Sequence, residues 1–215
     1  MNLTRRIAQL VIGLFLYGIA IALMIRGAIG VGPWDVFGQG LARVTGLNFG
    51  LLINIVGALV LLLWIPLRQK PGIGTVANVL LIGPSAEVGL WLVPTIDVLW
   101  VRVALFVAGL LLLAVASGLY IGARMGPGPR DGLMTGIHTR FGVRIWIART
   151  IVELSVLIVG WILGGNVGVG TVAFALLIGP LVNITIPRLR VPVIARPEPV
   201  DVTGPPTSPV AIQPS

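Results

Sequence analysis

The chain repeats one pattern of glycines, prolines and an aspartate at a constant distance of 96 residues. A Gly-x-Gly-Pro-x-Asp motif begins at Gly30 and again at Gly126. A Gly-x-Gly-Thr-Val-Ala motif, closed by Leu-Leu-Ile-Gly-Pro, begins at Gly72 and again at Gly168, with no insertion between the copies. Composition alone does not hold these residue types in register over such a length, so the pattern indicates an internal duplication.

Composition shows that lipid surrounds the folded chain. Of the 215 residues, 56% are hydrophobic and only 10% are charged, whereas a soluble domain carries about 25% charged residues. The net charge of +8 raises the question of nucleic-acid binding, but the basic residues lie between apolar runs of membrane length, which argues against it. With no cysteine and a single histidine, His138, the chain lacks the ligands of a thiolate or histidine metal site, and we predict no cofactor.

Six segments are long and apolar enough to cross a bilayer, which takes about 20 residues of helix. Each copy of the duplication holds three of them. We therefore predict an all-α integral membrane protein with six transmembrane helices, at residues 7–29, 49–67, 73–93, 101–123, 145–163 and 167–186.

An odd number of spans turns the second copy upside down relative to the first. The expected architecture is therefore two inverted three-helix repeats, 1–96 and 97–187, related by a two-fold axis in the membrane plane, as in many secondary transporters. Residues 188–215 are rich in proline and predict a disordered tail.

The basic residues predict the orientation. Of the fifteen lysines and arginines, only Arg26, Arg43 and Arg102 fall on the side opposite the N-terminus. Because cytoplasmic loops carry the excess of positive charge, we expect a protein of the cytoplasmic membrane with both termini and the tail in the cytoplasm.

The Gly-x-Gly-Pro-x-Asp motifs predict two short helices, at 33–44 and 129–140, because proline fits the first helical turn. Both are too short to span the membrane, so each is interfacial or re-entrant. The aspartates either cap these helices or mark helix starts that aim free N–H groups at a solute or ion. The residues concerned are Gly32, Pro33, Asp35, Gly128, Pro129 and Asp131.

A second matched feature is a Gly-Pro pair inside the third span of each copy, which predicts a helix break. Three residues after each proline stands a polar side chain, Glu87 in one copy and Asn183 in the other, which makes them candidates for a solute or ion site. Alternatively, the glycines only allow close packing and Glu87 lies near the headgroups. The paired residues are Gly83, Pro84, Gly179 and Pro180.

Span five places Arg149 and Glu153 four residues apart on one helix face. An unpaired charge near mid-span costs about 2.5–3.5 kcal/mol on insertion scales, so Glu153 is either paired with Arg149 or Arg144, or couples a proton or solute to transport. Asn54 and Thr150 form another matched polar pair that could face the same interior.

Several stretches together resemble the YczE-like bacterial integral membrane proteins, a group that also includes YyaS and YitT. They are Gly32-Pro33-Trp34-Asp35, the segment from Leu63 to Thr75, and Gly126 to Gly136. The resemblance covers residues 5–189. It implies a multi-pass bacterial membrane protein and brings no functional residues with it.

The architecture predicts a small-solute transporter or exporter with its site between the repeats. A non-transporting scaffold or regulatory protein is the main alternative, and a membrane-embedded enzyme is a weaker one, because no catalytic motif is present. Apart from the lipid bilayer, the expected partner is a small solute or ion, and a homo-oligomer stays open.

Overall fold

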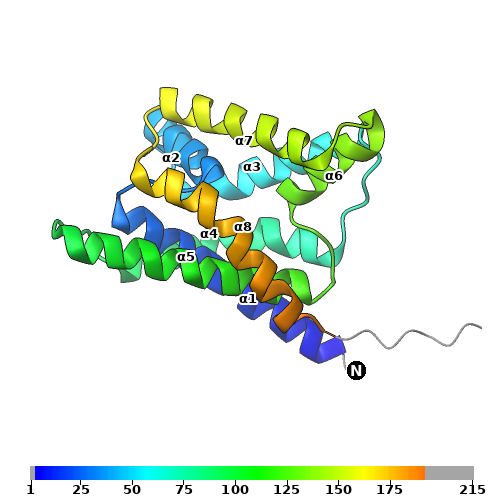
Figure 1. Ribbon diagram of the computed structural model, residues 1–215, viewed down its shortest axis with the longest axis horizontal. Helices are drawn as coiled ribbons and strands as arrows, with labels where there is room; N and C mark the ends of the chain where they lie inside the picture. The colour runs from blue at the N-terminus through cyan, green and yellow to red at the C-terminus, as the bar shows by residue number, and fades with distance from the viewer. Residues whose placement is uncertain (1–2, 192–215) are drawn as a thin grey trace, which may run out of the picture.

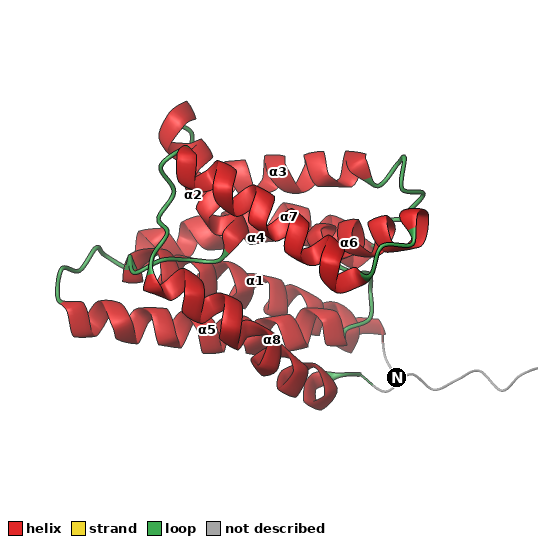
Figure 2. Cartoon of the chain, turned by 45° about the horizontal axis from the view of Figure 1, so that its top comes forward, coloured by secondary structure: helices red, strands yellow, loops and turns green. Residues whose placement is uncertain are grey.

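The computed structural model describes residues 3–191, and within this range the chain is entirely helical and without strands (Figures 1 and 2). Of the predicted tail, 188–215, all but the first four residues lie outside the described residues. The helices are α1 (Leu3–Gly27), α2 (Pro33–Thr45), α3 (Phe49–Leu63), α4 (Ile73–Leu92), α5 (Leu99–Gly122), α6 (Pro129–Phe141), α7 (Ile145–Ile162) and α8 (Val169–Leu189).

Five helices, α1, α4, α5, α7 and α8, are long and apolar enough to cross a membrane, as a multi-pass membrane protein requires. A sixth span exists only if α2 and α3, which meet at 115°, are taken together. Alone, α3 has 15 residues, a length of about 22 Å. It ends earlier than predicted because proline cannot continue the hydrogen-bond ladder, and the chain passes through turns around Pro66.

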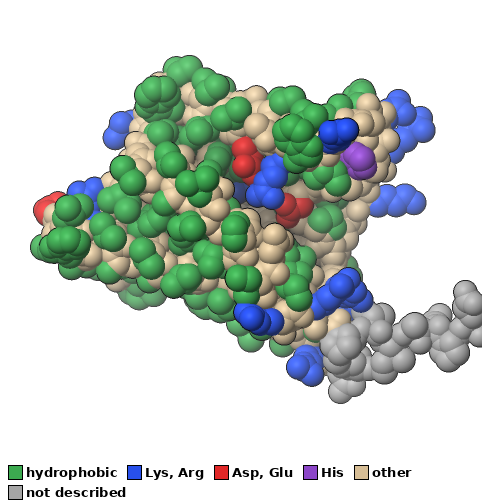
Figure 3. All heavy atoms as spheres, in the orientation of Figure 1, with side chains coloured by type: hydrophobic (Ala, Val, Ile, Leu, Met, Phe, Trp, Pro, Cys, Tyr) green, Lys and Arg blue, Asp and Glu red, His purple; other side chains and the backbone are tan. Residues whose placement is uncertain are grey.

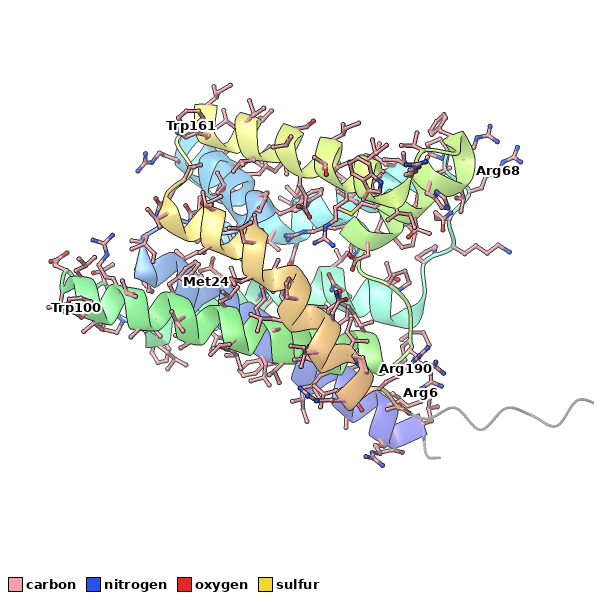
Figure 4. All side chains as sticks on the ribbon, viewed as in Figure 1. Arg6, Met24, Arg68, Trp100, Trp161 and Arg190 are labelled. Atoms are coloured by element: carbon pink, nitrogen blue, oxygen red, sulfur yellow. The ribbon has the colours of Figure 1, made fainter. Side chains whose placement is uncertain are left out.

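The long helices run between two chemically different ends of the molecule. Arg6, Arg68 and Arg190 lie at one end, and Trp100 and Trp161 lie at the other (Figure 4). Along the chain, α1, α4 and α7 run from the arginine end, whereas α3, α5 and α8 run toward it (Figure 1). Lipid-facing apolar side chains cover the length between the two ends.

Helix α1 is the centre of the packing, because it lies against both α4 and α5 through glycines. A Cβ at Gly18 would lie 2.4 Å from Ser85 Cβ of α4, and one at Gly13 would lie 2.8 Å from the backbone nitrogen of Tyr120 on α5. Such backbone contact is typical of helix packing in lipid, where small residues permit close approach.

The backbone follows the 96-residue offset closely. Helices begin at Pro33, Phe49 and Ile73, and again at 129, 145 and 169. All the residues with positive φ among those described are paired at this offset as well: they are Ala28, Gly30, Gly46, Arg68, Arg124, Gly126, Gly142 and Gly164. The duplication therefore extends to turns where the residue types differ, such as Ala28 and Arg124.

Reciprocal hydrogen bonds join the two halves. Gly170 N–H donates to Ile29 O at 2.8 Å, and Gly74 N–H donates to Met125 O at 2.7 Å. Each bond is the other shifted by 96 residues, with donor and acceptor exchanged between the halves. The loop that opens each copy is thus held by the first turn of the last helix of the other copy.

The Gly-Pro pairs do not break their helices, in contrast to the prediction. Helix α4 runs through Pro84 and α8 runs through Pro180. One proline removes a single ladder hydrogen bond. On α4, the adjacent Gly83 N–H also has a partner from another helix, Asn54 Oδ1 on α3 at 3.1 Å.

Candidate functional site

A cavity of about 260 Å³ lies between the two halves and is bordered by residues of all eight helices. Its volume is slightly below the range of about 300–1,000 Å³ that is usual for small-molecule sites. Five charged side chains line it, together with two tyrosines, two asparagines and a serine. These polar residues are Tyr17, Asp35, Asn78, Ser117, Tyr120, Arg130, Asp131, Arg149, Glu153 and Asn183.

At one wall, the starts of α2 and α6 bring Asp35 and Arg130 together. Arg130 Nη2 lies 3.9 Å from Asp35 Oδ1, and the guanidinium lies over the Trp34 ring, 4.9 Å from its centroid. Asp35 is only 3% exposed. Its Oδ1 and the Nε1 of Trp34 are both buried without a hydrogen-bond partner. A native fold rarely leaves such groups unsatisfied, and they often mark a place where a ligand or water binds.

Asp131, the counterpart of Asp35 at the start of α6, does have a hydrogen-bond partner. Tyr120 Oη donates to Asp131 Oδ2 at 3.1 Å, and the Tyr120 ring meets the Tyr17 ring edge to face at 5.8 Å. Asp35 and Asp131 lie in the first turns of α2 and α6, and the residue before each helix is a glycine without a side-chain cap. Stabilisation of the two helix starts by the aspartates, like the binding of a solute or ion there, therefore stays a prediction.

A third charged pair lies on α7. Arg149 Nε donates to Glu153 Oε1 at 2.9 Å, and both residues line the cavity. The side chains are 51% and 29% exposed. Figure 3 shows acidic and basic side chains around a hollow between α7 and α8, on a face that is otherwise largely apolar. Glu153 is therefore paired with Arg149 and also lines the cavity, whereas the coupling of a proton or solute by Glu153 stays a prediction.

Two of the predicted site residues lie outside the cavity and join α3 to α4. Glu87 Oε1 accepts from Gly50 N–H at 2.6 Å in the first turn of α3, and Asn54 Oδ1 accepts from Gly83 N–H at 3.1 Å. Both contacts satisfy backbone groups between helices. Asn183, the counterpart of Glu87, does line the cavity, as do Gly32, Pro33, Gly128, Pro129 and Gly179.

Sequence reasoning missed several polar residues of the cavity. Tyr17 and Tyr120 are the two tyrosines of the chain, and both line it. A phenol within an apolar span was a usable signal, because a buried hydroxyl needs a partner. The contact of Arg130 with Asp35 joins residues 95 positions apart, and no local pattern shows such a pair.

Equivalent positions of the two halves line the same cavity. Pro33 and Pro129, Asp35 and Asp131, and Ile82 and Ile178 all line the cavity. At five further matched positions the halves differ: the first half has Tyr17, Trp34, Ile53, Gly57 and Asn78, and the second half has Leu113, Arg130, Arg149, Glu153 and Phe174 in their places. Within residues 3–191 no group of three histidines, cysteines or carboxylates could hold a metal ion.

A family model described as a family of unknown function, DUF6198, matches residues 4–187. This range holds all eight helices except the ends of α1 and α8. The chain belongs to the DUF6198 family.

Relatives of this DUF6198 member occur in Haemophilus influenzae and in Bacillus subtilis. An uncharacterized protein of Haemophilus influenzae is 35% identical over 179 residues, covering 83% of this chain and 82% of the relative. The uncharacterized membrane protein YczE of Bacillus subtilis is 32% identical over 178 residues, covering 82% of this chain and 83% of the relative. YyaS of the same organism is 26% identical over 182 residues, with 82% and 90% covered. The resemblance to YczE and YyaS drawn from the motifs is confirmed. No solved structure matches.

Proposed function

We propose that this DUF6198 protein is a small-solute transporter of the cytoplasmic membrane, with its site in the cavity between two inverted repeats. The observation that carries the proposal is the cavity itself: matched residues of both halves form its walls, and five charged side chains line it. Charged residues are expensive within a membrane and occur there mainly where they serve a solute or ion pathway.

Three observations support the proposed inverted arrangement. Helices of the two halves begin at the same offset, equivalent helices such as α1 and α5 run in opposite directions (Figure 1), and reciprocal hydrogen bonds exchange donor and acceptor between the halves. Exchange of this kind is the signature of a two-fold axis. Because equivalent helices run in opposite directions (Figure 1), we expect the axis to lie in the membrane plane and to pass through the cavity.

The orientation follows from the arginines. Arg6, Arg68 and Arg190 share one end of the molecule (Figure 4). The smaller basic set lies toward the other end: Arg102 Nε donates to Gly27 O at the C-terminus of α1, and Arg26 donates to Leu90 O near the end of α4. The positive-inside rule therefore favours a cytoplasmic position for the first end, where α1 begins and α8 ends.

Transport of a solute from this site requires that the two halves rock against each other, as in other inverted-repeat transporters. Asp35 and Arg130 belong to different halves and lie at the interface that such a motion would change. The buried Oδ1 of Asp35, which has no hydrogen-bond partner, is the group that we expect to bind the solute directly. Arg130 positions this carboxylate.

Flux in proteoliposomes tests the proposal. Currents on solid-supported membranes are recorded for tetraethylammonium, choline, lactate, benzoate and glucose, with wild-type protein and with Asp35→Asn, Glu153→Gln and Asp97→Asn. Asp97 is exposed in the loop before α5 and serves as the control. We expect current with at least one solute, reduced at least tenfold by the two cavity variants and unchanged in Asp97→Asn. Absence of current with every solute, or equal currents in all variants, would overturn the proposal.

A further inference from the structure

The seam between α3 and α4 is closed by glycines. A Cβ at Gly83 would lie 2.1 Å from Asn54 Oδ1 and 2.2 Å from Gly50 O. A Cβ at Gly50 would lie 2.4 Å from Gly83 O, and one at Gly57 would lie 3.2 Å from Val79. These distances leave no room for side chains, so the two helices touch through their backbones along this side of the cavity.

The equivalent seam between α7 and α8 is open. A Cβ at Gly179, the counterpart of Gly83, would meet no atom within 4 Å. The counterparts of Gly50 and Gly57 are Trp146 and Glu153. The close contact between α3 and α4 leaves no space for a Cβ at Gly50, and α7 has Trp146 at this position. The sequence of α7 therefore keeps the α7–α8 seam open.

The open seam leads into the cavity from the side. Arg149 and Glu153 on α7 and Gly179 and Asn183 on α8 all line the cavity, and the hollow between these helices is visible in Figure 3. Both helices are candidate membrane spans, and apolar residues such as Leu154 and Leu176 face outward around the opening. The opening therefore faces hydrocarbon, while polar groups line its interior.

We propose that the α7–α8 seam is a lateral portal, and that the ligand of the cavity is a cationic amphiphile dissolved in the bilayer. Its positively charged head lies among the carboxylates, and its apolar tail extends between α7 and α8 into the lipid. The site is that of the proposed function, but binding through the portal does not require a transport step.

The charges and aromatic rings of the cavity select a cationic head. Three carboxylates face two guanidiniums, so with every group ionised the cavity lacks one positive charge, which in a membrane must be supplied by a partner. Tyr17, Trp34 and Tyr120 add aromatic rings at the same place, and such rings attract organic ammonium groups. The exposed guanidinium of Arg149 stays paired with Glu153.

Binding to the full-length protein in phosphatidylcholine nanodiscs tests the proposal, with dodecyltrimethylammonium, tetramethylammonium and dodecanoate as probes and thermal unfolding as the readout. We expect stabilisation by dodecyltrimethylammonium alone. Tetramethylammonium has the charged head without the apolar tail, and dodecanoate has the tail but the opposite charge. Asp35→Asn and Gly179→Leu should each weaken this binding at least tenfold, the second by filling the seam. Leu111→Phe, at an exposed residue of α5 that does not line the cavity, is the control and should bind as wild type does.

A nitroxide at Gly179→Cys gives a second measurement that does not depend on the plugged variant. The chain has no cysteine, so the label is unique. We expect frequent collisions with oxygen, which dissolves in lipid, and few with a water-soluble nickel chelate. A label shielded from both reagents would overturn the portal, as would equal binding in wild type and Gly179→Leu. Preference for dodecanoate or tetramethylammonium would overturn the assigned ligand. Loss of flux with binding intact contradicts only the transport proposal.

Discussion

The two halves share one backbone plan, yet their α3–α4 and α7–α8 seams differ completely. Gly83 and Gly179 stand in identical Leu-Leu-Ile-Gly-Pro stretches, but one meets Asn54 and Gly50 directly and the other faces open space. The difference arises across the seam, where Gly50 and Gly57 are replaced by Trp146 and Glu153. A duplicated scaffold can therefore close one side of a cavity and open the other by changing side chains alone.

The crossings of the short helices show the opposite outcome, because there the two halves compensate each other. Where α2 meets α7, Gly160 lies against the backbone of Val36 and Phe37. Where α6 meets α3, the glycine is on the short helix: Gly132 lies against Trp64. Large and small residues have exchanged places at equivalent positions, so both crossings stay filled. Close packing is therefore kept in both halves at the crossings of the short helices, whereas in the second half it is lost at the α7–α8 seam.

The largest loss of stability should come from a substitution where α6 crosses the end of α3. Trp64 is 2% exposed, and its Nε1 donates to Pro129 O at 3.0 Å. Trp64→Ala should lower the free energy of unfolding by about 3–5 kcal/mol, because it leaves a cavity beside Gly132. Denaturation in detergent micelles measures this. Trp161→Ala, at a residue 64% exposed to lipid, should change little, and equal losses would contradict the compensated crossing.

The two seams predict the next effect. Gly83→Leu should destabilise the protein by about 3 kcal/mol, since the new side chain meets backbone and Asn54 at once. Gly179→Leu should leave the unfolding temperature unchanged or slightly raised, because glycine is a poor helix former and space is available. Thermal unfolding of both variants under one condition decides the matter. A similar drop in both would show that the α7–α8 seam closes as the α3–α4 seam does.

Substitution of the two threonines beside the reciprocal loops, Thr75 and Thr171, should cause smaller losses of stability, and the two losses should differ. Thr75 Oγ1 donates to Pro127 O at 2.7 Å and accepts from Gly72 N–H at 3.1 Å, whereas Thr171 Oγ1 accepts only from Gly168 N–H, at 3.3 Å. Thr75→Val should cost about 1–3 kcal/mol and Thr171→Val about 1 kcal/mol, in proportion to the hydrogen bonds lost. Chemical denaturation measures both, and the double variant should show additive losses. Reversal of the order would contradict the assigned bonds.

The smallest effect concerns the polar residues that follow the prolines. Glu87 accepts a hydrogen bond in the first turn of α3, where a negative charge stabilises the helix by about 0.3–1 kcal/mol. Glu87→Gln should lose that amount. Asn183→Ala should leave stability within about 0.5 kcal/mol and weaken binding of dodecyltrimethylammonium, because Asn183 lines the cavity. A binding defect in Glu87→Gln with normal stability would reverse the two roles.

Much of the fold was predictable from the sequence, whereas the site was predictable only in part. The motifs located both short helices, since a proline after glycine starts a helix wherever it occurs. Asp35, Asp131, Arg149, Glu153 and Asn183 all line one cavity, and their role as a solute or ion site stays a prediction. Glu87 and Asn54 look equally polar and symmetric in the sequence, but they satisfy backbone groups between α3 and α4.

The sequence by itself determined the duplication, the lipid surroundings and the positions of the helices, because residue spacing and hydropathy are properties of the chain read along its length. Only the tertiary structure decided that Arg130 lies against Asp35, that both tyrosines face one cavity, and that the seam beside Gly179 is open. Each of these depends on which atoms another helix places opposite a residue. The stretches around Gly83 and Gly179 are identical, so the local sequence does not determine these surroundings.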